Sequence, residues 1–241
     1  DSCNIKDQTL FLYQNHIEKS FLKSRKFHLY NNESILPELI LIDSRIDCSS
    51  IYNPFIKKDN QLIIIDNIDK WVKNANSIIL PSFYANEKKV NDFVKKKNIN
   101  VLFGKEYSVL SSPILERKNT NDKILITFGG SDPNNVTLKV IDMLWKTEFK
   151  NRLRIIFGPG YLHNKEEIIQ KYKGIETIFD CKDMALEIGN SSIVVTALGT
   201  TIQDIEFYGK KSIIICNHEY DLDDYYYINK MSRLKSRMQC V

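Results

Sequence analysis

Short runs of apolar, mostly β-branched residues recur along the chain and are separated by polar stretches. Such runs are typical of strands that are buried on both faces, as in a parallel sheet. The predicted strands cover residues 39–42, 62–65, 77–80, 101–103, 124–128, 153–157, 176–179, 193–195 and 213–216. Between them, apolar residues recur at helical spacing in three stripes: Val90, Phe93, Val94; Val136, Val140, Leu144; and Ile168, Ile169, Tyr172. The alternation of strands and helices predicts an α/β fold.

A polar stretch near the middle of the chain divides this pattern. Residues 116–123 are charged or turn-forming, and none of them is apolar. A break here predicts an N-terminal α/β domain over residues 1–118 and a C-terminal α/β domain over residues 119–241. The sequence starts at Asp1 without an initiator Met, which indicates a processed or truncated chain.

The positions of the glycines restrict where a glycine-rich phosphate loop can lie. The 241 residues include nine glycines, and all of them lie at or after Gly104. Because such a loop needs glycine for its sharp turn and close approach to a ligand, it must lie in the second half of the chain.

Charge and cysteine content argue against several classes of protein. The net charge of +4 is small and lacks the basic stripe of a nucleic-acid binder, so we expect no nucleic-acid partner. The five cysteines are an odd number without a CxxC pair, which disfavours a structural zinc site. No secretory signal is visible, so we expect a cytoplasmic protein. No apolar run approaches the ~20 residues that span a membrane.

The first segment that could carry chemistry is Gly129-Gly130-Ser131-Asp132, between a predicted strand and a predicted helix. The two glycines would let the backbone turn sharply and approach a ligand. Ser131 or Asp132 would cap the helix, and Pro133 would lie in its first turn. The free N–H groups at the helix start would then hold a phosphate. The same residues would equally suit a tight strand–helix turn that binds nothing.

A second segment of small residues follows the strand at 193–195. It consists of Thr196, Ala197, Leu198, Gly199, Thr200 and Thr201. Its backbone N–H groups could meet phosphate oxygens, and Asp204, one turn into the next helix, could accept hydrogen bonds from a ribose. Alternatively, this is a capped helix in which Asp204 interacts favourably with the helix dipole.

The third segment is a polar loop after the strand at 213–216, where α/β proteins bind ligands. Its candidates for contacting a sugar are Asn217, Glu219, Tyr220 and Asp221, although a solvated acidic loop would look the same. A metal site at His218, Glu219 and Asp221 has no specific spacing, so we expect no metal. In the N-terminal half, Asp43 follows a predicted strand and is a further candidate on the sugar side.

The order and spacing of FGGSDPNN, TALGTT and SIIICN resemble a family of nucleotide-sugar hydrolases in the pseudaminic-acid pathway. Members of this family hydrolyse UDP-2,4-diacetamido-2,4,6-trideoxy-β-L-altropyranose and are similar to the spore-coat polysaccharide protein group. The resemblance implies a GT-B-like fold, in which two Rossmann-like domains face a cleft, with an incomplete N-terminal domain here. It also implies a UDP-sugar substrate, no cofactor, and a role in pseudaminic-type acid or surface polysaccharide biosynthesis.

The resemblance assigns residues as well. Residues 129–132 match the family's glycine-rich loop, residues 196–201 match its second phosphate-facing helix start, and Asp204 stands where a Glu usually holds the ribose. Residues 219–221 fall near the sugar. In the family, the His of a Gly-His-x-x-Arg motif is thought to activate water. His16, in Asn15-His16-Ile17-Glu18-Lys19, is the candidate here, although the glycines of the motif are absent.

Two other functions fit the same residues. A GT-B glycosyltransferase would use an acceptor hydroxyl in place of water, with the same UDP-sugar donor. A catalytically impaired protein would bind the nucleotide sugar without turnover.

Overall fold

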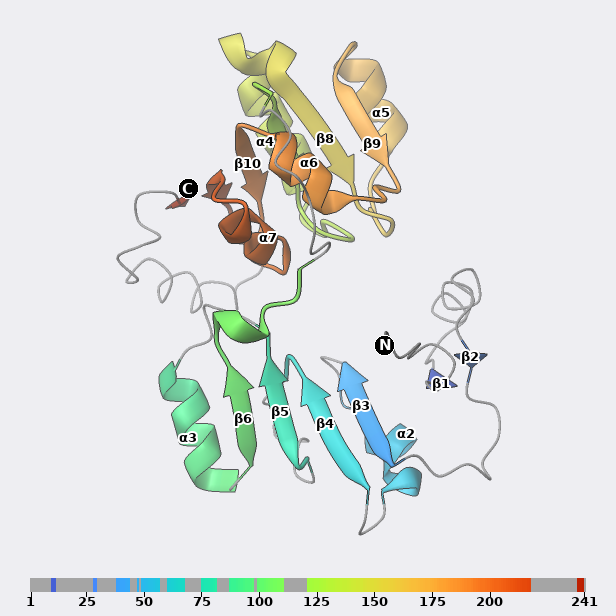
Figure 1. Cartoon of the computed structure of the whole chain (residues 1–241). Helices are drawn as coiled ribbons and strands as arrows, with labels where there is room; N and C mark the ends of the chain where they lie inside the picture. Colours follow the sequence, from blue (N-terminus) through green and yellow to red (C-terminus); the bar gives the residue numbers. More distant parts are fainter. Residues whose placement is uncertain are drawn as a thin grey trace, which may run out of the picture. The chain divides into compact units, whose positions relative to one another are not determined.

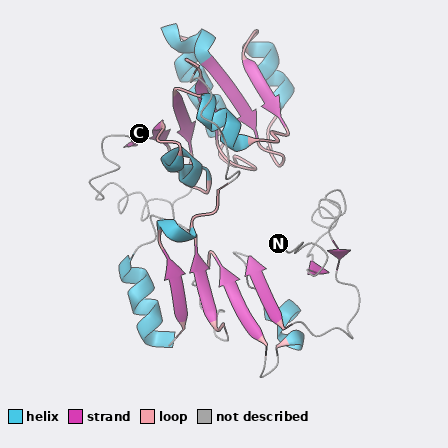
Figure 2. Cartoon of the chain, viewed as in Figure 1, coloured by secondary structure: helices cyan, strands magenta, loops and turns pink. Residues whose placement is uncertain are grey.

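Helices and strands alternate along both halves of the chain in the computed structural model (Figure 1, Figure 2). The structure describes residues 10–11, 28–29, 38–43, 47, 49–56, 60–67, 75–81, 87–97, 99–110, 121–217 and 238–240. The chain divides into two compact units, Asp1–Ile40 with Ser49–Gln61 and Leu41–Cys48 with Leu62–Val241. The boundary predicted after residue 118 falls in residues 111–120, outside the described part.

The larger sheet has six parallel strands. They are β7 (Ile124–Thr127), β8 (Leu153–Phe157), β9 (Glu176–Phe179), β10 (Ile193–Thr196), β11 (Lys211–Ile214) and β12 (Met238–Cys240). Their order across the sheet is β12-β11-β10-β7-β8-β9, so β7, the first of these six strands along the chain, lies in the middle. This is the strand order of doubly wound nucleotide-binding sheets.

Helices cover both faces of this sheet. Successive strand residues point to opposite faces, so neighbouring residues of one strand pack against different helices. The helices are α4 (Val136–Trp145), α5 (Lys165–Lys171), α6 (Met184–Asn190) and α7 (Thr201–Phe207), with the short η4 (Glu148–Arg152) before β8. Ile124 and Ile126 of β7 lie in the core that includes residues of α4 and α5. Leu125, between them, packs in the core that includes residues of α6 and α7.

The smaller sheet has the order β3-β4-β5-β6, in which neighbours in the sheet are also neighbours in the chain. Its strands are β3 (Leu39–Asp43), β4 (Gln61–Ile65), β5 (Ser77–Leu80) and β6 (Asn100–Phe103). The helices along this part of the chain are α2 (Ser49–Tyr52), η2 (Asn53–Phe55), α3 (Glu87–Lys97) and η3 (Lys105–Tyr107). Ile64 and Ile78 pair in register and are fully buried. A separate two-stranded parallel pair joins β1 (Leu10–Phe11) and β2 (His28–Leu29).

The two parallel sheets with alternating helices confirm the predicted α/β class. All nine predicted strands are present, and no end differs by more than two residues. The largest shift is at β11, which begins at Lys211 rather than at residue 213. Its register with β10 pairs Ile193 with Lys211, so backbone pairing extends the strand beyond its apolar residues.

Candidate functional site

The strand order of the larger sheet reverses between β7 and β10. β8 and β9 continue on one side of β7, whereas β10, β11 and β12 lie on the other. In doubly wound sheets, ligands bind outside the carboxyl ends of the strands at such a reversal. The loops that follow β7 and β10 contain the predicted residues 129–132 and 197–200. The structure therefore places both predicted segments at this reversal.

The loop between β7 and α4 contains two neighbouring glycines. Gly129 has a φ of 76°, which favours glycine, and both Gly129 and Gly130 are exposed. The carbonyl of Gly130 accepts from the Gly160 N–H at 2.9 Å, and that of Ser131 accepts from the Leu162 N–H at 3.2 Å. Among the described residues, no hydrogen bond uses the N–H of Gly129 or Gly130. Successive free N–H groups of this kind form anion-binding loops.

Asp132 caps α4 with its carboxylate. The residue is 2% exposed, and its two carboxylate oxygens accept from the N–H groups of Val136 at 2.9 Å and Thr137 at 2.8 Å. The N-cap position itself is Asn135, which makes no side-chain cap hydrogen bond, so the helix begins later than predicted and Asp132 reaches its first N–H groups from three residues before the cap. Because α4 starts at Val136, Pro133 precedes the helix instead of lying in its first turn. Because the carboxylate already occupies these two N–H groups, they do not hold a phosphate as expected. A bound anion would use the glycine N–H groups instead.

The loop after β8, residues 158–163, belongs to this site although it was not predicted. A Cβ on Gly158 would stand 2.2 Å from the Gly129 carbonyl oxygen and 2.4 Å from that of Gly130. The Tyr161 hydroxyl donates to Asn135 Oδ1 at 2.7 Å. The signal for this contact was the Gly-Pro-Gly sequence at 158–160, because glycines next to a strand often mark the close approach of another backbone.

Asn217, which follows β11, meets the same loop. It is 5% exposed, and its Nδ2 lies 3.5 Å from Asp132 Oδ1. Asn134 Nδ2 donates to the Asn217 backbone carbonyl and, at 3.2 Å, to its Oδ1. The third predicted segment therefore reaches the first through Asn217. The remaining sugar-side candidates of this segment lie outside the described residues, and they are Glu219, Tyr220 and Asp221.

The β10–α7 loop has the predicted turn and helix. Thr196 ends β10 with 1% exposure, Thr200 is exposed, and α7 starts at Thr201. A Cβ added to Gly199 would meet nothing within 4 Å, so this backbone leaves the open space that the close approach of a ligand would need. Asp204 lies in the first turn of α7, as predicted, but is only 3% exposed. Its burial leaves little of the side chain for a ribose to contact.

Two candidates come from the N-terminal half. Asp43 is the last residue of β3 and is exposed, so it stands at the carboxyl end of a strand as predicted. His16 lies outside the described residues.

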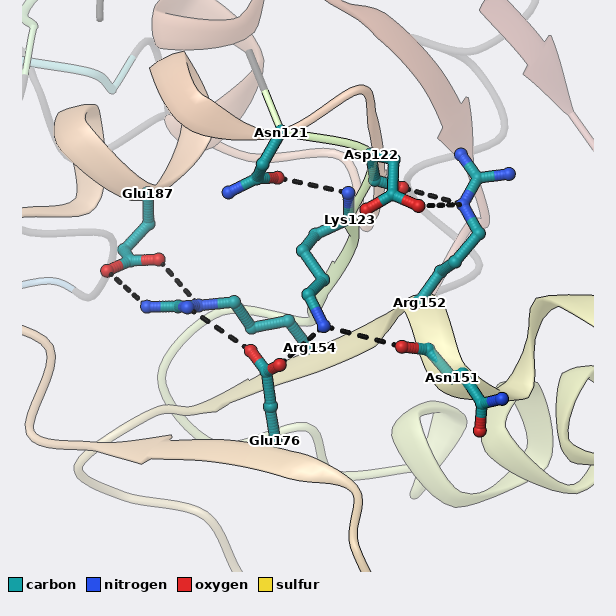
Figure 3. Close-up of polar contacts among 8 residues, drawn as sticks. All are labelled: Asn121, Asp122, Lys123, Asn151, Arg152, Arg154, Glu176 and Glu187. Atoms are coloured by element: carbon teal, nitrogen blue, oxygen red, sulfur yellow. Dashed lines mark hydrogen bonds and ion pairs between the residues drawn. The ribbon is translucent and has the colours of Figure 1, made fainter. Parts of the chain in front are cut away.

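The opposite, amino end of the larger sheet carries a network of ion pairs (Figure 3). Arg154 of β8 makes a bidentate pair with Glu187 of α6, with N–O distances of 2.8 and 2.9 Å. It also contacts Glu176 at 3.3 Å, and Lys123 pairs with the same carboxylate. The hydrogen bond and charge of Lys123 lower the pKa of Glu176. These charges pair with one another, which favours a structural role for this edge.

Metal sites and membrane spans are both absent from the part of the chain that the structure describes. No three His, Cys, Asp or Glu side chains among these residues come together as a metal site would require. No helix in the same residues has the length and apolar character needed to cross a membrane.

The chain has a distant relative among known proteins, whereas no protein-family model matches it. It is similar to "Uncharacterized protein MJ1062" of Methanocaldococcus jannaschii, with 26% identity over 225 aligned residues. The alignment covers 85% of this chain but 46% of the relative, so the chain spans about half the length of the protein it matches.

Proposed function

We propose that the larger sheet binds the diphosphate of a UDP-linked sugar and that the protein hydrolyses this nucleotide sugar. One observation supports the binding: the exposed residues Gly129 and Gly130, whose N–H groups make no hydrogen bond among the described residues, stand at the strand-order reversal, next to the strand that leads into the β10–α7 loop. The proposed substrate is a UDP-linked diacetamido-trideoxy sugar, as implied by the resemblance, which is strong over roughly residues 120–230. The free sugar would serve pseudaminic-type acid or surface polysaccharide biosynthesis.

The proposed reaction breaks one bond and forms one. Water attacks the anomeric carbon, and the bond from that carbon to the diphosphate oxygen breaks, so UDP leaves with the bonding electron pair. A general base takes the proton from the attacking water. The base is not identified in this chain, and His16, the candidate that the resemblance offers, lies outside the described residues. The N–H groups of Gly129 and Gly130 would donate to the diphosphate, where negative charge increases as the bond breaks.

The negative charge of Asp132 lies close to this proposed anion site, and its placement limits the repulsion. The carboxylate accepts from two backbone N–H groups at the N-terminus of α4. The partial positive charge at that end of the helix compensates the carboxylate.

The test combines binding with product analysis. UDP binding is measured by calorimetry, and the protein is incubated with UDP- and CMP-linked amino sugars while NMR follows nucleotide release. Gly130→Ala adds a methyl group in open space, so the fold should be kept. The methyl group would stand beside the proposed diphosphate site and should weaken UDP binding. Gly189→Ala, on α6, is the matched control: its Cβ would lie 3.9 Å from the Tyr208 ring, and the variant should bind UDP like wild type.

Each result decides between the functions. Release of UDP and free sugar without an acceptor supports the hydrolase. Release only in the presence of an acceptor would indicate a glycosyltransferase, and binding without release would indicate an impaired enzyme. No UDP binding by wild type would refute the proposal.

A further inference from the structure

Two non-glycine residues of the β7–α4 loop have left-handed backbone conformations. Asp132 has a φ of 42° and Asn135 a φ of 51°. Asp and Asn tolerate this region better than other residues, but it is still unfavourable for them. Such conformations persist where surrounding contacts fix them, and they are frequent at binding sites. The contacts that fix these two residues therefore bear on what the loop does.

The β8–α5 loop supplies a contact to each of them. The Tyr161 hydroxyl donates to Asn135 Oδ1 at 2.7 Å. The His163 Nε2 lies 2.9 Å from the Asp132 carbonyl oxygen, so this nitrogen carries the proton. The same carbonyl accepts from the Asn135 N–H at 3.0 Å, which links the two left-handed residues.

Tyr161 is built to keep its position and its proton. Its side chain packs against Phe157 with ring centroids 4.8 Å apart and against His163 at 5.3 Å. Burial and the charge of Asp132 raise the pKa of Tyr161 to about 12. The hydroxyl therefore stays a hydrogen-bond donor throughout the physiological pH range.

We propose that Tyr161 and His163 are positioning residues for the anion-binding loop. By holding Asn135 and Asp132 in left-handed conformations, they fix the path of the loop and keep the N–H groups of Gly129 and Gly130 exposed. This inference rests on the proposed nucleotide binding, in which those N–H groups contact the diphosphate.

The test compares two tyrosines. Tyr161→Phe removes the hydrogen bond to Asn135. Tyr172→Phe is the matched control, because Tyr172 is also buried and its hydroxyl also donates to a side chain, that of Asp142. Asp142 belongs to α4, so this hydrogen bond lies outside the loop. UDP affinity should fall about tenfold in Tyr161→Phe and less than twofold in Tyr172→Phe. The carbon chemical shifts of Asn135 should leave the left-handed range only in Tyr161→Phe.

Histidine substitutions test the second contact. His163→Gln keeps a side-chain N–H donor and should retain most of the affinity for UDP. His163→Phe has no such donor and should lose most of that affinity. A merely structural role would lower the melting temperature without separating the Gln and Phe variants in UDP affinity.

The outcomes separate this inference from the proposed function. If wild type binds UDP and Tyr161→Phe binds it equally well, the positioning role is refuted while the proposed function stands. Unchanged Asn135 shifts in Tyr161→Phe would also refute the positioning role. If wild type binds no nucleotide, both fall together.

Discussion

Gly158→Ala should be among the most damaging single-methyl changes in the larger sheet. The added Cβ would stand 2.2 Å from the Gly129 carbonyl oxygen, 2.4 Å from the Gly130 carbonyl oxygen and 2.6 Å from the Gly130 Cα. These are backbone atoms, so no side-chain rotation can relieve the overlap and the two loops must separate. Overpacking typically costs 1–3 kcal/mol, and we expect a cost near the upper end, about 3 kcal/mol.

Gly160→Ala is the control in the same loop, since its Cβ would be 3.4 Å from the nearest atom, the Gly130 carbonyl oxygen. We expect it to change stability by less than about 1 kcal/mol, because the stiffer unfolded chain offsets the slight crowding. A difference of about 3 kcal/mol corresponds to roughly 6–12 °C in melting temperature for a protein of this size.

The assay should report on the larger sheet alone. Trp145 ends α4 and packs edge-on against Tyr172 at 5.3 Å, so its fluorescence follows the unfolding of this sheet. Replacing the other tryptophan, Trp71→Phe, makes Trp145 the single reporter. Equal melting temperatures for Gly158→Ala and Gly160→Ala would refute the close approach of the two loops.

Two further predictions concern the cap and the ion network. Asp132→Ala removes both hydrogen bonds to the first turn of α4 and should lower the free energy of unfolding in urea by about 2 kcal/mol. Asn164→Ala removes the one hydrogen bond that caps α5 and should cost less. The pKa of Glu176 is lowered, so the stability that its carboxylate contributes is fully present above the ordinary glutamate pKa of about 4.5. This stability is lost as the pH falls through the lowered pKa. Between about pH 5 and pH 3, wild type should therefore lose more stability than Glu176→Gln, by less than about 1 kcal/mol because the glutamate side chain is 44% exposed. Parallel pH curves for the two proteins would contradict this.

The sequence was sufficient to locate the strands because burial on both faces leaves a strong local signal. Runs such as residues 153–157 contain mostly apolar residues and coincide with β8. α6 was not predicted, since it is short and contains a glycine, and its N-terminus depends on Asp183, whose carboxylate accepts from the Leu186 N–H at 2.8 Å. β12 was not predicted either, because three residues give too short a pattern.

The candidate site was predictable only in part. Glycines and small residues after strands pointed to the loops that follow β7 and β10, and the structure places both at the strand-order reversal. The role of Asp132 was visible only as a cap. The sequence pattern does not show that both carboxylate oxygens accept from Val136 and Thr137, which leaves neither N–H group for an anion, or that the Asp132 backbone is left-handed.

The contacts between loops depend on which strands become neighbours, and local sequence does not encode this. Asn217 and Asp132 are 85 residues apart, yet they approach because β10 and β11 return to the side of β7 opposite to β8. Residues from the β8–α5 loop reach Asp132 from the other side, through His163. The β7–α4 loop is therefore held from both sides of its strand. Because the two contacts come from independent loops, a substitution that removes only one of these side-chain contacts should loosen the glycine N–H groups without disrupting the sheet beneath them.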